Sequence, residues 1–183
     1  MFRDNSLVPA EALRLAALGM LAEAPRRYGE LSGEIRHFAS RIAGPSIELM
    51  GTSVELLRYE RLIEASSEGP ESDDNPMLRL TLDGRELLQN LLRVPLKAPG
   101  SQFNRLFLAL KLRFLHLLPA AERARQLDLI ADWYRSERAR LEELRGHPSA
   151  NAPLFQTWLD QETAQIDARL QWLVEAARAV PGT

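Results

Sequence analysis

The sequence of 183 residues contains no cysteine. Without thiols, the chain can form no disulfide bond, offer no thiolate nucleophile and hold no cysteine-bound zinc ion. Stability must therefore come from packing. A chain of this length is enough for one ordinary domain, or for a small domain with an extension. Apolar residues make up 45% and charged residues 26%, which are values typical of globular proteins.

Long apolar runs are missing as well. The most hydrophobic stretch, residues 106–118, is interrupted by Lys111 and Arg113, so no segment reaches the roughly 20 apolar residues that span a bilayer. The first residues, Met1 to Asp4, place no basic segment before an apolar one, as a signal peptide would. We therefore expect a cytoplasmic protein with no membrane partner.

Sequence patterns typical of catalysis are also missing. The three histidines, His37, His116 and His147, fall on different expected elements and lack the spacing of metal ligands. The glycines form no phosphate-binding loop after a strand, and no serine has the sequence context of an activated nucleophile. We expect the chain not to be an enzyme and to need neither a metal ion nor another cofactor.

Positive charge is scarce in the first half of the chain. Residues 1–95 contain 11 arginines against 15 aspartates and glutamates, a balance of −4, whereas residues 96–183 contain 12 lysines and arginines against 10 acidic residues. If residues 1–95 bind DNA, the binding must depend on a few well-placed arginines, because the net charge of this half supplies no general attraction to phosphate.

Three helices are expected in the first part of the chain. Apolar residues recur at helical spacing from Pro9 to Ala24, where a proline ends the pattern. A second run, from Leu31 to Ile42, has steps of four, three and four residues and is closed by Gly44-Pro45. A third begins at Ser46, a good N-cap residue, and its apolar stripe ends at Leu62.

The pattern then changes to that of a β-hairpin. Residues 63–68 are short enough to be extended, residues 69–76 are turn formers, and Met77 to Leu82 alternate apolar and polar side chains. A fourth helix, capped by Thr81 or Asp83, ends before Pro95. This order predicts a mainly α fold that opens with a winged helix-turn-helix domain, α-α-α-β-β-α, over residues 1–95.

The second half is expected to be a separate helical region. Residues 95–100, Pro-Leu-Lys-Ala-Pro-Gly, predict a domain linker because they cannot continue a helix. Helices are expected over residues 101–118, 119–145 and 153–179, the first apolar on most faces and the last with a heptad seam.

Residues 96–183 are therefore predicted to form an all-α dimerisation domain, because three such helices bury their apolar surface poorly alone. The alternative is an intramolecular three-helix bundle with the seam turned inward. The residues expected at the dimer interface are Leu106, Phe107, Leu110, Leu159, Ile166, Leu170 and Leu173.

A helix-turn-helix places the N-terminal half of its recognition helix in the major groove, while the wing and flanking residues contact phosphates. The expected recognition helix is the third one. Glu48 or Glu55 could accept a hydrogen bond from cytosine there. The candidate DNA-contacting residues are Arg26, Arg27, Ser46, Glu48, Thr52, Ser53, Glu55, Arg58, Arg61 and Arg79.

Three stretches of the sequence resemble the PadR family of transcriptional regulators. Residues 15–25, Leu-Ala-Ala-Leu-Gly-Met-Leu-Ala-Glu-Ala-Pro, look like the opening helix of that family. Residues 79–88, Arg-Leu-Thr-Leu-Asp-Gly-Arg-Glu-Leu-Leu, are similar to its Arg-Leu-Thr-x-x-Gly strand-to-helix junction. Residues 117–122 and 170–173 resemble its C-terminal dimerisation arm.

The sequence also departs from the PadR pattern. The family's Gly-Tyr-Glu-Leu entry to the second helix appears as Tyr28-Gly29-Glu30-Leu31, and its recognition-helix tyrosine is replaced by Gly51. The wing, usually basic in the family, is acidic over residues 68–75. The departures therefore concern the DNA contacts more than the fold.

The resemblance implies a homodimeric DNA-binding transcription regulator of the repressor type, whose partner is double-stranded DNA with a palindromic operator. Control by a small effector lodged between the domains belongs to the same expectation. The alternative hypothesis is a winged-helix dimer that no longer binds DNA and acts as a protein-interaction module. The acidic wing and the −4 balance of residues 1–95 favour this alternative.

Overall fold

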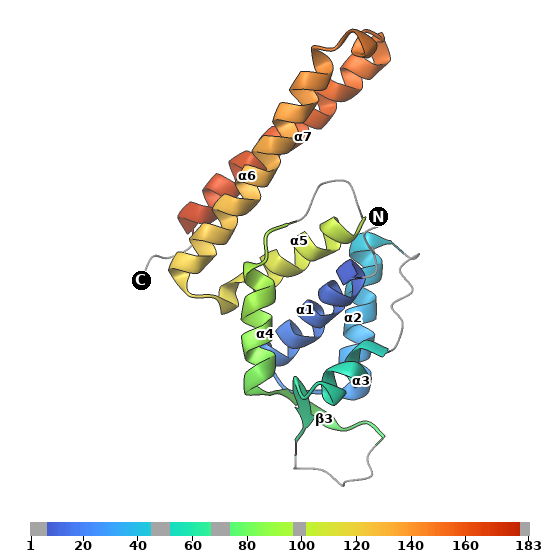
Figure 1. Ribbon diagram of the computed structural model, residues 1–183, viewed down its shortest axis with the longest axis vertical. Helices are drawn as coiled ribbons and strands as arrows, with labels where there is room; N and C mark the ends of the chain where they lie inside the picture. Colours follow the sequence, from blue (N-terminus) through green and yellow to red (C-terminus); the bar gives the residue numbers. More distant parts are fainter. Residues whose placement is uncertain (1–6, 45–51, 67–73, 97–101, 180–183) are drawn as a thin grey trace. The chain divides into compact units, whose positions relative to one another are not determined.

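The computed structural model of the chain describes residues 7–44, 52–66, 74–96 and 102–179. The order of its elements is that of a mainly α, winged-helix fold, as predicted. The helices are α1 (Leu7–Glu23), α2 (Tyr28–Ala43), α3 (Thr52–Tyr59), α4 (Leu82–Arg93), α5 (Gln102–Phe114), α6 (Ala120–Arg145) and α7 (Pro153–Ala179), and the strands are β1 (Arg26–Arg27), β2 (Ile63–Ala65) and β3 (Met77–Leu80) (Figure 1).

Contacts within the chain divide it into two compact units. The first contains α1 to α5 and the three strands, and the second contains α6 and α7. This division differs from the expected boundary after residue 95, because α5 packs against α1 and α2 instead of joining the C-terminal helices. The expected linker, residues 95–100, lies mostly outside the described residues.

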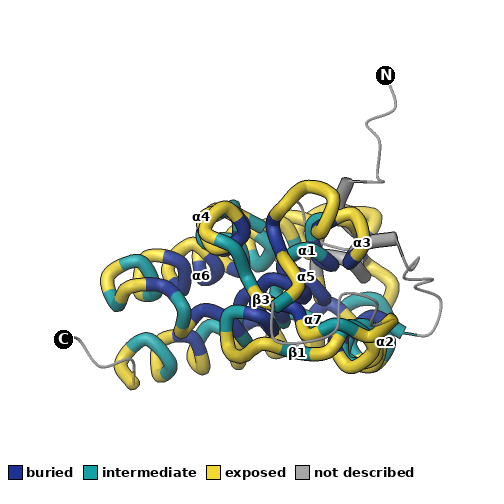
Figure 2. The backbone as a smooth tube through the Cα atoms, turned by 90° about the horizontal axis from the view of Figure 1, so that it is seen from below, coloured by how far each residue is buried: buried dark blue, intermediate teal, exposed yellow. Residues whose placement is uncertain are grey.

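Helix α1 is the centre of the first unit. It contacts α2, α3, α4, α5 and β3, and its residues from Ala12 to Leu21 are all buried except Arg14 (dark blue in Figure 2). Its short apolar side chains allow this close packing, and Leu15, Leu18 and Met20 are completely buried. Burial of such side chains stabilises the fold by about 1.5–3 kcal/mol each.

The sheet confirms the predicted β-hairpin and adds a strand that the sequence pattern missed. Strands β2 and β3 pair antiparallel, with Glu64 opposite Arg79. The two-residue strand β1 pairs with the other edge of β3, so the strand order is β1-β3-β2. A strand of two residues is too short to produce an alternating pattern, which is why the sequence gives no sign of it.

The junction between β3 and α4 explains the Arg-Leu-Thr-x-x-Gly motif in physical terms. Thr81 is the N-cap of α4, and its Oγ1 accepts a hydrogen bond from the Gly84 N–H at 3.0 Å. The same hydroxyl lies 2.9 Å from the carbonyl oxygens of Arg61 and Leu62 and donates to them. A Cβ on Gly84 would lie 2.0 Å from the Leu62 oxygen, so only glycine allows this close approach.

The second unit is a hairpin of two long antiparallel helices, α6 and α7, which lie side by side (Figure 1). Leu127, Ile130 and Tyr134 of α6 are buried in it. Arg138 of α6 forms ion pairs with Glu142 at 2.6 Å and with Asp167 of α7 at 2.7 Å. The bounds of α7 agree with those predicted, and the alternative of an intramolecular three-helix bundle is not what the structure has, because α5 belongs to the first unit.

The buried positions also correct the residues expected at a dimer interface. Leu106, Phe107 and Leu110 are buried in the first unit, where α5 meets α1 and α2. The seam residues Leu159, Ile166 and Leu173 are at most 4% exposed in the α6–α7 hairpin, and Leu170 is half-buried. Because the protomer itself covers six of these seven side chains, they offer almost no surface to a partner chain.

Candidate nucleic-acid interface

Helix α3 follows α2 as the second helix of a helix-turn-helix. Its side chains Val54 and Leu57 are buried, at 3% and 0% exposed, and anchor the helix to the core. Glu55, Arg58 and Tyr59 are exposed, and their spacing of three and four residues places them together on a face beside this anchor. This polar face is therefore free to meet another molecule.

Part of the expected recognition helix lies outside the described residues, namely Ser46 and Glu48. Thr52 and Ser53 form the start of α3, and their side chains are not among those described. The structure does add Tyr59, which is 86% exposed and which the sequence analysis did not propose. Its place between Arg58 and Glu60, outside the apolar stripe, is the sequence signal that could have identified it.

The C-terminus of α3 ends earlier than predicted, in a Schellman motif. The Leu62 N–H donates to the Leu57 carbonyl at 2.9 Å, and the Arg61 N–H donates to the Arg58 carbonyl at 3.0 Å. Arg61 has a φ of 59°, the left-handed conformation that this motif requires of the residue after the helix. The chain therefore turns sharply from α3 into β2.

Most of the arginines proposed to contact DNA are engaged by other groups of the protein. Arg26 lies 2.9 Å from Glu34 and 3.7 Å from Glu23, and its Nε donates to the Met20 carbonyl. With only 23% of its side chain exposed, Arg26 links α1 to α2 and is not a free phosphate contact.

The wing strands carry a further ion pair. Arg79 of β3 and Glu64 of β2 are directly opposite each other and lie 2.8 Å apart, with about half of each side chain exposed. Arg58 differs from both arginines, because it forms no ion pair or hydrogen bond through its guanidinium within the described ranges. The local balance of charge is therefore closer to neutral than the number of arginines indicates.

The base of the wing is fastened to the start of α2. Asn75 Oδ1 accepts a hydrogen bond from the Gly29 N–H at 2.7 Å, and the Asn75 carbonyl accepts one from Arg27 at 3.0 Å. The Tyr28 N–H donates to the Pro76 carbonyl at 3.0 Å. These bonds fix where the wing leaves the domain. The sequence analysis missed this role of Asn75, which it treated only as a turn former.

A buried lysine connects α4 and α5. Lys111 is 1% exposed and donates a hydrogen bond to the carbonyl of Val94, the C-cap residue of α4. Burial removes water from the ammonium group and lowers the pKa of Lys111 from 10.5 to about 8. The lysine that interrupts the most apolar stretch of the sequence is therefore a structural residue of the first unit.

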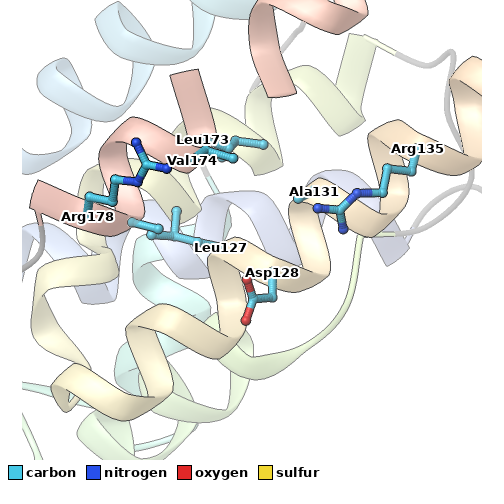
Figure 3. A pocket seen from close by; sticks show the side chains of 8 residues that line it. Leu127, Asp128, Ala131, Arg135, Leu173, Val174 and Arg178 are labelled. Atoms are coloured by element: carbon cyan, nitrogen blue, oxygen red, sulfur yellow. The ribbon is translucent and has the colours of Figure 1, made fainter. Parts of the chain in front are cut away.

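The second unit contains a hollow of about 320 Å³ between α6 and α7. Figure 3 labels Leu127, Asp128, Ala131 and Arg135 on α6, together with Leu173, Val174 and Arg178 on α7. Buried apolar side chains and charged groups of both signs share its lining. The aromatic side chains Trp133, Tyr134 and Trp158 are not among the lining residues.

Neither a metal site nor a membrane-spanning helix is found in the part of the chain that the structure describes. Among them no group of three or more histidines, aspartates and glutamates could hold a metal ion. No helix among them combines the length and the apolar character needed to cross a membrane.

A helix-turn-helix followed by an antiparallel hairpin and a further helix defines the winged helix-turn-helix class of proteins. A family model described as "Putative AphA-like transcriptional regulator" matches residues 2–177. The chain therefore belongs to this family of PadR-like transcriptional regulators, which confirms the resemblance seen in the sequence. The family is one of regulators and not a class of enzymes.

Solved structures of similar proteins include smu.1604c from Streptococcus mutans UA159, with 15% identity over 89% of this chain and 96% of that chain and a TM-score of 0.39. Bacillus subtilis PadR has 16% identity, covers 100% of both chains and has a TM-score of 0.35. Bacillus subtilis PadR in complex with operator DNA has 17% identity over 92% of this chain and 99% of that chain, with a TM-score of 0.34. No curated protein matches the sequence.

Proposed function

We propose that this chain regulates transcription by binding double-stranded DNA as a homodimer. The observation that carries the proposal is the exposed face of α3, where Glu55, Arg58 and Tyr59 reach solvent while Val54 and Leu57 anchor the helix to the core. A helix held in this way at the surface of a winged helix-turn-helix is the element that enters the major groove. Membership of a family of transcriptional regulators supports the same function.

The homodimer is proposed from the outer surface of the α6–α7 hairpin. Two helices form a single layer, so they can bury only the side chains that face each other. Large apolar side chains remain between 38% and 87% exposed on the hairpin, and a second copy would cover them: Leu129, Leu144, Leu154, Trp158, Trp172 and Val174. We propose this exposed surface as the dimer interface, in place of the seam residues that the sequence predicted.

A two-fold dimer presents two copies of α3 and two wings, so its operator should be a palindrome. Half-sites should be separated by about 34 Å, which is one turn of DNA, or by a multiple of it. Selection of bound duplexes from a random pool tests this proposal. Enrichment of a palindrome supports it, and recovery of no preferred sequence contradicts it.

Control by a small effector is a further part of the proposal. The hollow between α6 and α7 has an apolar lining from Leu127, Ala131 and Leu173 and charged groups from Asp128 and Arg135. A ligand with one apolar and one polar end would suit such a lining. Binding of an effector to the α6–α7 hairpin would change the affinity of the dimer for DNA if the DNA-bound and DNA-free states of the dimer had different affinities for the effector.

The second candidate function is a protein-interaction module that binds a basic partner. The pairing of Arg26 with Glu34 and of Arg79 with Glu64 favours this alternative, because it removes two cations from the surface that would meet phosphate. The same selection experiment separates the two functions. A protein-interaction module would enrich no DNA sequence.

A further inference from the structure

Arg61 occupies a backbone conformation that glycine would adopt with less strain. It follows the recognition helix at the position where a Schellman motif requires a left-handed residue, and its φ is 59°. An L-residue there brings its Cβ close to the following carbonyl oxygen, which is why glycine is the usual choice. The Arg61 side chain is exposed, so packing does not explain why arginine is tolerated.

The Arg61 side chain lines a hollow of about 490 Å³ beside the wing. Arg79 and Arg85 line the same hollow, together with Glu64 and Asp83. Glu64 is already engaged by Arg79 at 2.8 Å. Arg61 and Arg85 donate no hydrogen bond and form no ion pair through their guanidinium groups within the described part of the chain. The hollow therefore has two arginines available for an external anion.

The backbone around this hollow is held firmly. The Thr81 hydroxyl donates to the Arg61 carbonyl, and the Thr81 cap fixes the first turn of α4, from which Arg85 projects. Gly84 allows that turn to approach Leu62 closely. The two arginines therefore come from different elements, α4 and the residues after α3, that share one hydrogen-bonded junction.

We propose that Arg61 and Arg85 form a binding site for a phosphate of the DNA backbone, next to the groove that α3 enters. The inference rests on the proposed DNA-binding function and adds to it a contact outside the face of α3. Guanidinium groups bind phosphate oxygens through paired N–H donors, and such contacts set position and affinity without reading sequence. The demand for this contact explains why arginine is kept in a left-handed conformation.

The test is the variant Arg61→Gly, because it separates stability from binding. Relief of the left-handed strain should raise the Tm by about 2–4 °C. Loss of the phosphate contact in both protomers should weaken binding to the selected duplex roughly tenfold or more and reduce the salt slope of the affinity by about 2, which is about 1 for each contact. Arg85→Ala should reduce affinity and slope similarly, whereas Arg61→Lys, which keeps the charge but not the paired N–H donors, should lose less affinity than Arg61→Gly. Fluorescence anisotropy and thermal unfolding measure both properties.

Arg93→Ala is the matched control, because Arg93 is exposed at the other end of α4 and does not line the hollow. Its DNA affinity should stay within about twofold of the wild-type protein. An Arg61→Gly protein with unchanged affinity and salt slope would overturn the phosphate site while leaving DNA binding intact. An Arg61→Gly protein that is less stable than wild type would show a structural role for the arginine and would also overturn it. A wild-type protein that binds no DNA would overturn the proposed function and, with it, this site.

Discussion

The ring of Phe114 in α5 lies against the backbone of Gly19 in α1, so that a Cβ at position 19 would be only 2.5 Å from Cδ2 and Cε2 of the ring. Phe114 is completely buried. The central glycine of the opening helix therefore serves as the contact surface for a helix nearly 100 residues further along the chain. This contact explains why α5 belongs to the winged-helix unit.

Gly19→Ala should destabilise the protein by about 1–3 kcal/mol, because the added methyl group overlaps the Phe114 ring in a packed core. Chemical denaturation measures the effect. Gly33→Ala is the matched control, since Gly33 is exposed on α2 with nothing within 4 Å of a Cβ. That change should stabilise the protein by about 0.5–1 kcal/mol. Equal effects of the two substitutions would contradict the close packing of α1 and α5.

Phe114→Leu should partly rescue the Gly19→Ala variant, because a smaller side chain leaves room for the methyl group. The free energies of unfolding of the two single variants and the double variant form a cycle that measures this coupling. The double variant should be more stable than the two separate losses predict. Strict additivity would show that the two residues do not interact.

Thr81→Ala should lower the free energy of unfolding by about 1–2 kcal/mol, since the variant loses the N-cap of α4 and the donor to the Arg61 and Leu62 carbonyls. Thr81→Ser keeps the hydroxyl and should stay close to wild type. Urea unfolding of the three proteins compares them directly. A Thr81→Ser variant as unstable as Thr81→Ala would show that the methyl group, and not the hydroxyl, stabilises the junction.

Burial of Lys111 should make stability depend on pH between about 8 and 10.5, the folded and unfolded values of its pKa. Below both values the lysine is protonated in either state, and burial of its charge opposes folding. As the pH rises through this window, the folded protein loses the proton first. The free energy of unfolding therefore rises with pH across this window, by up to roughly 3 kcal/mol.

The measurement for Lys111 is the stability difference between wild type and Lys111→Met as a function of pH. Methionine has no titrating group, so effects of other residues cancel in the difference. The free energy of unfolding of the wild type should rise relative to that of the variant between pH 8 and pH 10. A constant difference would show that Lys111 is not desolvated in the folded protein.

Trp172→Glu should shift the proposed dimer towards monomer, because it places a charge among the exposed apolar side chains of the hairpin. Trp172 is 49% exposed, so the folded protomer should tolerate the change. Sedimentation velocity measures the mass, with Gln165→Glu, an exposed polar position on the same helix, as the control. A Trp172→Glu protein with the same mass as wild type would place the dimer contact elsewhere.

Local sequence patterns predict an element but not the elements that it packs against. Periodicity located α7 because a proline opens it and apolar residues recur through it, and the motif at Thr81 and Gly84 located the junction. The packing of α5 against α1 and α2 was not predicted, because an apolar pattern indicates that a helix is buried but not which elements cover it. Similarly, sequence places Arg26 beside α2, whereas only the fold shows that Glu34 engages it.

The most direct test of DNA binding is the affinity of the wild-type protein for its selected duplex between 50 and 200 mM salt, followed by fluorescence anisotropy. Contacts to several phosphates from each protomer release counterions, so the affinity should fall by about 10³-fold or more, with two protomers bound to each duplex. Absence of binding at 50 mM salt, or an affinity that does not change with salt, would contradict the account.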